Sequence, residues 1–265
     1  LEIQMIKFRV SWLRKFAQAA FRCIRTDNRD VGLSSKTRGN PPIFRSALER
    51  MLCTDKPAVN SAYELTDMAQ DCLVVLDETA TKRAHIWGVS MGGMIAQTFA
   101  AIYPDRTETL TSVMSTTGNP LVGQPTSVAL EALSRNAAGE TREEITSELV
   151  HASELYSGDL FDSISARIII EEAYDRCYCP DGMAFQMAAI ASSGDRTEML
   201  KAIIAPTFVI HGSKDPLINW DGGEATVEAI PKSTFVLYEH MGHDLPIQLW
   251  DAYLENFLDL VKVNP

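Results

Sequence analysis

A serine held between two glycines is the feature of this sequence with the clearest chemical meaning. Ser90 ends an apolar run, and Gly88 and Gly92 stand two positions to either side of it. This spacing suits a sharp turn from a strand into a helix, where a Cβ at either glycine would collide with neighbouring backbone. The turn would expose the Ser90 hydroxyl and aim the Met91 N–H at the oxygen of an attacked carbonyl. The pattern predicts a nucleophilic serine with Met91 as an oxyanion donor.

A serine nucleophile needs a base that takes its proton and an acid that orients the base. Both residue types follow downstream, each after an apolar run that is typical of a strand. Asp215 comes after the run 207–211, and His243 comes after the run 234–238. Because ligands meet α/β sheets at the carboxyl ends of the strands, we expect both side chains to reach Ser90. The chain order Ser, Asp, His differs from that of the two familiar serine protease folds.

Other residues compete for the roles of acid and base. Asp221 or Asp244 could orient the base instead of Asp215, which we favour because it stands at a predicted strand end. His240 is the alternative to His243, but it lies within or at the end of a strand, where a structural histidine is more common. His243 follows a glycine in a loop that is free to reach the serine. Structural or solvated positions are expected for the other three histidines: His85, His211 and His151.

The composition is that of an ordinary globular protein with one large domain. The chain has 265 residues, of which 46% are hydrophobic and 22% charged, values that disordered and fibrous chains do not show. The net charge of −11 argues against a nucleic-acid partner, because such proteins need a basic face. No apolar run reaches the roughly 18 residues of a membrane span. A small-molecule substrate is therefore expected, with no nucleic acid and no membrane as partner.

The cysteines and the N-terminal segment indicate where the protein works. The five cysteines are scattered, with no C-x-x-C pair and no histidine at ligand spacing. Neither a disulfide framework nor a zinc site is predicted, and no cofactor is implied. Basic residues interrupt the first 25 positions, unlike the unbroken apolar stretch of a secretory signal. Phe8, Trp12 and Phe16 recur at helical spacing, so we expect a core-facing helix there and a cytoplasmic location.

Strands and helices alternate on both sides of a mostly helical stretch. Strands are expected at 21–25, in the run that ends at Ser90, and at 110–114, 207–211 and 234–238. Helices are expected at 66–76 with Thr66 as cap, from 91 to about 103, and at 223–229 and 246–261, with a loop around Pro41 and Pro42. This alternation predicts a mostly parallel sheet with helices on both faces. Residues 1–117 and 197–265 would form this core.

The stretch between the two parts of the core is expected to form a helical lid over residues 118–196. Its candidate helices lie at 121–133, 143–155, 166–174 and 183–191. Apolar side chains are frequent here, and they either line a pocket or pack the lid onto the core. The predicted architecture is thus an α/β core with an inserted helical lid.

With these motifs the chain resembles the α/β-hydrolase superfamily, in the serine esterase branch of the aclacinomycin (anthracycline) methylesterases. Besides the serine turn, the resemblance rests on 27–34 after a strand, Tyr103-Pro104-Asp105-Arg106, 188–196, 206–216 and 242–246, and it covers nearly the whole chain. It implies Ser90 as nucleophile and His243 as base. It also implies Asp215 as the orienting acid and Met91 as one oxyanion donor. The loop 27–34 is then mainly a structural element near the pocket.

The resemblance departs from the family pattern at the N-terminus. Family members open with three strands and a glycine-containing loop that supplies the second oxyanion N–H, just before a Gln-Met-like start of the first helix. Gln4-Met5 stands about where that helix begins, so we expect an N-terminally truncated fold that lacks roughly 25 to 35 residues. Losing one oxyanion donor typically slows a reaction about a hundred- to a thousandfold. A missing strand would also leave backbone groups unpaired in the sheet.

The resemblance implies a hydrolase of small to medium carboxylic esters that works through an acyl-enzyme. Two other readings stay open. One is cleavage of C–C bonds, or cofactor-free perhydrolysis, by the same serine turn. The other is a non-catalytic chain that at most binds a ligand under the lid, which the missing oxyanion loop favours. Epoxide hydrolases and haloalkane dehalogenases are not expected, because they carry Asp at the position of Ser90.

Overall fold

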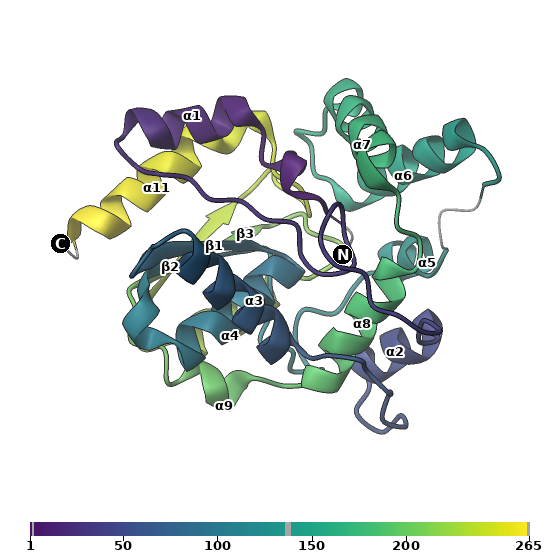
Figure 1. Ribbon diagram of the computed structural model, residues 1–265, viewed down its shortest axis with the longest axis horizontal. Helices are drawn as coiled ribbons and strands as arrows, with labels where there is room; N and C mark the ends of the chain where they lie inside the picture. The colour runs from purple at the N-terminus through teal and green to yellow at the C-terminus, as the bar shows by residue number, and fades with distance from the viewer. Residues whose placement is uncertain (2, 136–138, 264–265) are drawn as a thin grey trace.

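A four-stranded parallel sheet is the centre of the computed structural model, which describes residues 1, 3–135 and 139–263 (Figure 1). Its strands lie side by side in chain order: β1 (Ala84–Val89), β2 (Thr107–Val113), β3 (Thr207–Gly212) and β4 (Ser233–Tyr238). All three neighbouring pairs are parallel. Their carboxyl ends therefore meet at one edge of the sheet, where the loops that follow them lie together.

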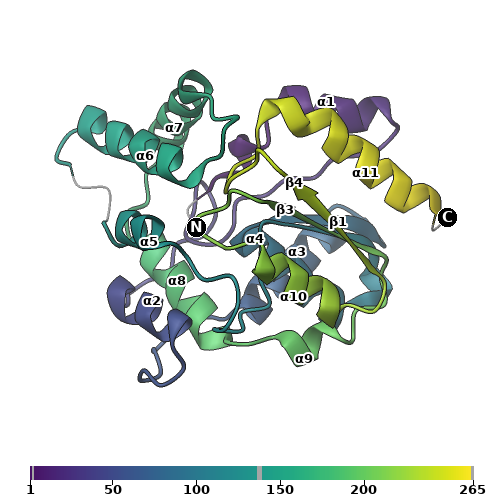
Figure 2. The ribbon, with the colours of Figure 1, turned by 180° about the vertical axis from the view of Figure 1, so that it is seen from behind.

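Helices cover both faces of the sheet, which explains why nearly every residue of its central strands β2 and β3 is buried. Figures 1 and 2 show α1 (Val10–Gln18) and α11 (Trp250–Val263) on one face. The other face carries α3 (Leu65–Glu78), α4 (Met91–Ile102) and α10 (Asp221–Ala229). Leu110 of β2 and Ile210 of β3 are fully buried, and they point into the clusters on opposite faces. The predicted parallel sheet with helices on both faces is confirmed.

Aromatic packing fixes α1 on the sheet. The Trp12 ring stacks on Trp250 of α11 with 5.7 Å between ring centroids, and it meets the edge of Trp87 of β1 at 5.6 Å. Trp12 is only 2% exposed. The core-facing helix predicted from the spacing of Phe8, Trp12 and Phe16 is thus present, and burial of such large rings stabilises it.

The remaining helices lie mostly between β2 and β3 in the sequence. These are α5 (Ser127–Ser134), α6 (Arg142–Tyr156), α7 (Ser163–Cys177), α8 (Gly182–Ser193) and the short α9 (Thr197–Leu200), together with α2 (Phe44–Leu52) and the 3₁₀ turns η1 (Met5–Lys7), η2 (Pro104–Arg106) and η3 (Ile247–Leu249). The helices α6 and α7 pack against each other, and α8 packs against α2 (Figure 1). None of the helices in the described part of the chain combines the length and the apolar character that a bilayer crossing requires.

The prediction of a strand at 21–25 is wrong. This segment forms no ladder with β1 in the described structure, and side chains hold it instead. The Phe21 ring contacts the edge of Phe257 at 4.9 Å, and the Arg25 guanidinium donates to the backbone oxygen of Met5 at 3.2 Å. No described strand lies beside β1 on this side to supply backbone partners, so the β-type residues of the segment stay extended without pairing.

Two helices also differ from the prediction: α3 has a different N-cap, and α2 was not predicted. Thr66 does not cap α3, because the N-cap is Glu64, two residues earlier, which forms a reciprocal capping box with Asp67. In the region predicted as a loop after Pro42, α2 forms because Ala47 and Leu48 bury one face against α8. Both differences arise from partners close in space that a linear pattern does not display.

Candidate active site

Ser90 stands at a strained turn between β1 and α4. Its backbone has φ 55° and ψ −122°, a conformation that costs a residue with a Cβ about 1–3 kcal/mol. The Ser90 N–H donates to the backbone oxygen of Val113 on β2 at 2.9 Å, which anchors the turn to the sheet. A Cβ on Gly88 would lie 2.0 Å from the Gly92 carbonyl oxygen. Gly88 is therefore required, and the predicted turn from strand to helix is present.

The steric role predicted for Gly92 is wrong. A Cβ on Gly92 would have no atom within 4 Å, whereas one on Gly93 would lie 2.7 Å from the Cβ of Ser115. Gly93, not Gly92, is thus the second place where α4 approaches a neighbour too closely for a side chain. Adjacent glycines in the sequence gave no means of telling these two roles apart.

The three residues predicted as nucleophile, base and acid come together in one chain of hydrogen bonds. His243 Nε2 lies 2.9 Å from Ser90 Oγ, and His243 Nδ1 lies 2.7 Å from Asp215 Oδ2. Ser90 follows β1, Asp215 follows β3 and His243 follows β4, so the site is built at the carboxyl edge of the sheet. This is the geometry in which an imidazole can take the proton of a serine hydroxyl.

Asp215 is buried but well supplied with hydrogen bonds. Its Oδ1 accepts from the backbone N–H groups of Leu217 and Ile218 at 2.9 Å each, and its Oδ2 faces His243 and lies 3.3 Å from His211 Nε2. Burial disfavours the charged carboxylate, but the two histidines and their hydrogen bonds more than offset this and lower the pKa of Asp215 to about 2. The site therefore holds a fixed negative charge behind His243.

The competing aspartates make other contacts. Asp221 Oδ1 accepts from the Gly123 N–H at 2.7 Å, and Asp244 Oδ1 accepts from the Gly242 N–H at 3.1 Å. Both carboxylates thus serve the loops around them, while the hydrogen bond to His243 comes from Asp215.

The competing histidines also lie in other surroundings. The His240 side chain is 63% exposed and bonds Asp159 at 3.0 Å. His85 contacts Thr109 Oγ1 at 2.9 Å, and the fully buried His211 contacts the backbone oxygen of Ile218 at 2.9 Å. The hydrogen bond to Ser90 Oγ is made by His243. The sequence analysis treated His211 as structural and did not predict that it lies close to Asp215. The short separation of four residues between the two was the available signal.

Met91 is the first residue of α4 and is 4% exposed. The N–H groups of the first helical turn have no carbonyl partner within the helix, and they lie at the positive end of the helix dipole. Met91 N–H follows Ser90 directly in the chain and is a candidate donor for an oxyanion, a role that stays a prediction. No second donor of this kind could be assigned from the sequence.

A cavity of about 1400 Å³ opens over these residues. Ser90, Met91 and His243 lie in its wall. The segment from α6 to α8, with the turn between α6 and α7, supplies much of its apolar lining, including Leu149, Tyr156, Phe161, Met183 and Met187. Such a lining accepts a partly hydrophobic molecule. Within the described ranges, no group of three or more His, Cys, Asp and Glu side chains is arranged to hold a metal ion.

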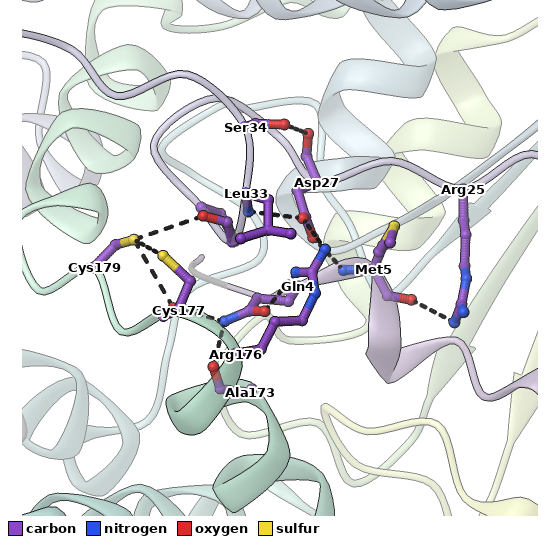
Figure 3. A network of polar contacts seen from close by, with 12 residues as sticks. Gln4, Met5, Arg25, Asp27, Leu33, Ser34, Ala173, Arg176, Cys177 and Cys179 are labelled. Carbon is purple, nitrogen blue, oxygen red and sulfur yellow. Dashed lines mark hydrogen bonds and ion pairs between the residues drawn. The ribbon is translucent and has the colours of Figure 1, made fainter.

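Another part of the cavity wall is fixed by Asp27, a residue of the loop 27–34. Its carboxylate accepts from the N–H groups of Met5 at 2.8 Å and Leu33 at 3.1 Å, and it pairs with Arg176 of α7 at 2.8 Å (Figure 3). Burial opposes the charge, yet these donors lower the pKa of Asp27 below its ordinary value. The loop thus ties the N-terminal segment to α7, as expected of a structural element.

Gln4 completes this tie, which sequence reasoning did not foresee. Its Nε2 donates to the backbone oxygens of Ala173 at 2.7 Å and Cys177 at 2.8 Å, at the end of α7 (Figure 3). Its Oε1 accepts from Arg176 at 2.7 Å. The carbonyl of Cys177, the last residue of α7, has no partner within the helix, so Gln4 caps α7 from a distant part of the chain.

The family follows from a comparison of the whole sequence. A profile of the alpha/beta hydrolase fold family matches residues 6–248. The chain belongs to this family. The predicted α/β-hydrolase fold is therefore confirmed, and the observed sheet with its flanking helices is the core of this hydrolase.

Individual relatives show how the hydrolase compares with characterised proteins. A 2-hydroxy-6-oxononadienedioate/2-hydroxy-6-oxononatrienedioate hydrolase of a Pseudomonas species is 26% identical over 218 residues, 77% of this chain and 74% of the relative. Rhodomycin D methylesterase DauP of Streptomyces sp. strain C5 is 26% identical over 257 residues, 89% of this chain and 80% of the relative. The similarity to anthracycline methylesterases expected from the motifs is confirmed by this match.

Solved structures agree on the fold. The meta-cleavage product hydrolase CumD of Pseudomonas fluorescens IP01 superposes with a TM-score of 0.71 at 16% identity, over 98% of this chain and 85% of its own. The superposition includes nearly every residue of this chain and does not test the predicted N-terminal truncation, which stays a prediction.

Proposed function

We propose that this hydrolase cleaves small to medium carboxylic esters through an acyl-enzyme formed on Ser90. The observation that carries the proposal is the unbroken hydrogen-bonded chain from Asp215 through His243 to the Ser90 hydroxyl. A buried carboxylate behind a histidine keeps the imidazole in the tautomer that accepts a proton on Nε2. The hydroxyl at the strained turn is then the atom that attacks.

The first half of the reaction transfers the acyl group. His243 Nε2 takes the proton of Ser90 Oγ while this oxygen bonds to the ester carbonyl carbon, and Asp215 stabilises the imidazolium that results. Met91 N–H stabilises the negative oxygen of the tetrahedral intermediate. The ester C–O bond then breaks, and the leaving alcohol takes the proton from His243.

The second half releases the acid. A water molecule gives a proton to His243 and attacks the acyl carbon, and the bond to Ser90 Oγ breaks as the serine regains its proton. Residues 118–196 form the lid in this proposal, and the apolar lining from α6 to α8 favours substrates with a hydrophobic acyl or alcohol group. The five free cysteines support the cytoplasmic location that we also propose.

A second candidate function is hydrolysis of a C–C bond. The 26% identity to a 2-hydroxy-6-oxononadienedioate/2-hydroxy-6-oxononatrienedioate hydrolase favours it. The ester proposal is preferred because the wider match, over 89% of this chain, is to a methylesterase. Turnover of a p-nitrophenyl ester against turnover of a dienedioate substrate distinguishes the two.

Labelling with a fluorophosphonate probe tests the proposed nucleophile. The wild type should label and should hydrolyse p-nitrophenyl butyrate, whereas Ser90→Ala and His243→Ala should do neither. Ser134→Ala is the matched control, since this serine is exposed on α5. Equal activity in wild type and Ser90→Ala would remove Ser90 from the mechanism. A folded wild type that neither labels nor turns over would favour a ligand-binding role.

A further inference from the structure

The turn between α6 and α7 touches the loop of His243 along the backbone. The His243 N–H donates to the backbone oxygen of Tyr156 at 2.7 Å, and the Asp159 N–H donates to the backbone oxygen of His240 at 3.0 Å. These two bonds lie on either side of Gly158 and join the turn to both ends of the segment 240–243. The base is therefore hydrogen-bonded, through its own N–H, to the last residue of α6.

Glycines allow these backbones to come into direct contact. A Cβ on Gly158 would lie 2.3 Å from the His240 carbonyl oxygen and 2.6 Å from the Gly242 nitrogen. A Cβ on Gly242 would lie 2.3 Å from the Gly158 nitrogen. On the other side, a Cβ on Gly212 at the end of β3 would lie 2.1 Å from the Met241 oxygen. The loop is thus held between β3 and the α6–α7 turn, with no room for a side chain on either side.

Side chains add a weaker link at the surface. Asp159 Oδ2 accepts from His240 Nδ1 at 3.0 Å and from Lys214 Nζ at 2.5 Å. All three side chains are about half exposed, so each pair contributes little by itself. The backbone contacts at Gly158 are therefore the main connection.

We propose that the α6–α7 turn positions His243 for proton transfer, with Gly158 as the positioning residue. The inference rests on the proposed function, in which His243 is the base. His243 must keep hydrogen bonds to Ser90 and Asp215 at once, and a displacement of about 1 Å in an active site can cost about a hundredfold in rate. The same turn belongs to the cavity wall, so it connects the base to α6 and α7, which line the cavity.

Gly158→Ala tests the positioning role, with Ile164→Ala as control because Ile164 is 72% exposed in the first turn of α7. We expect Gly158→Ala to lower kcat and the rate of fluorophosphonate labelling about a hundredfold, with KM within about threefold of wild type. Ile164→Ala should match the wild type in all three. Wild-type kcat and labelling in a folded Gly158→Ala variant would overturn the inference while leaving the proposed function intact.

A spectroscopic readout separates the two proposals when activity fails. The proton that His243 Nδ1 donates to Asp215 gives a low-field proton resonance, which is assigned by its loss in His243→Gln. The signal should be present in wild type and Ile164→Ala and should be lost or shifted in Gly158→Ala, whether or not esters are cleaved. An unchanged signal in Gly158→Ala overturns the positioning role.

Amide exchange of the wild type decides the matter if Gly158→Ala does not fold. The hydrogen bonds of the Asp159 and His243 amides both span the backbone contact at Gly158. These two amides should therefore exchange in the same opening event and show protection factors within about threefold of each other. Protection factors that differ more than about tenfold would overturn the inference, because the loop would then open independently of the turn.

Discussion

His243 Nδ1 and Asp215 Oδ2 lie 2.7 Å apart, with the Asp215 side chain fully buried and that of His243 8% exposed. The second oxygen of Asp215 is occupied by two backbone N–H groups. The carboxylate therefore cannot turn away from the imidazole, and the orientation of His243 is fixed from behind.

Asp215→Asn should lower kcat about a thousand- to ten-thousandfold with little loss of structure. The amide has the size of the carboxylate, but it stabilises the wrong histidine tautomer and cannot balance an imidazolium. Ester hydrolysis by purified protein measures the effect. Asp221→Asn is the matched control, which keeps the acceptor for Gly123 and should stay within about twofold of wild type. The reverse result would make Asp221 the orienting acid.

The ionised Asp215 should also stabilise the fold in a pH-dependent way. Its pKa is about 2 in the folded protein and 3.8 ordinarily, so the contribution is full above about pH 4 and is lost as the pH falls towards 2. The difference corresponds to about 2 kcal/mol. Urea unfolding of wild type and Asp215→Asn at pH 6, 4 and 3 should show the stability difference shrinking with acid. A constant difference would contradict this.

Gly88→Ala and Gly92→Ala should behave oppositely although both flank Ser90. A Cβ on Gly88 meets the Gly92 oxygen at 2.0 Å, so the turn must distort, and we expect loss of labelling and a lower melting temperature. A Cβ on Gly92 meets open space and helical backbone, so Gly92→Ala should melt at or slightly above the wild-type temperature. Calorimetry on both variants checks this, and equal destabilisation would disprove it.

Arg196→Met should destabilise the fold by about 3 kcal/mol. Arg196 is 4% exposed, and its guanidinium donates to Gln97 Oε1 at 2.9 Å and to the Thr116 backbone oxygen at 2.7 Å. Its burial lowers the pKa of Arg196 to about 10, and its removal leaves buried acceptors unpaired. Urea unfolding of Arg196→Met is compared with that of Arg135→Met, a control at a residue whose side chain is 67% exposed. Equal stability of the two variants would refute the argument.

The part of the site that lies at strand ends could be predicted from the sequence. Ser90, Asp215 and His243 each follow an apolar run, and parallel strands must bring their carboxyl ends to one edge. Local chemistry was enough here, because the glycine at position 88 and the loop position of His243 both reflect the backbone next to them.

Contacts between distant segments could not be predicted. The segment 21–25 has the residues of a strand, but whether a strand forms depends on a neighbour that no local pattern reveals. The role of Gly158 depends on where the α6–α7 turn meets the loop of His243, more than 80 positions later. Likewise, Gln4 caps α7 across a separation of 173 residues. Spacing along the chain carries no signal for such meetings.

The strand that leads to Ser90 lies at an edge. Within the described ranges β1 pairs with β2 alone, whereas β3 has a neighbour on each side. A strand with one ladder opens at a lower free-energy cost than a strand with two. On heating, the nucleophile should lose its place before the sheet melts, so inactivation and unfolding become separate events. The highest temperature at which the protein stays active is then set by the stability of the edge strand β1 and not by that of the whole sheet.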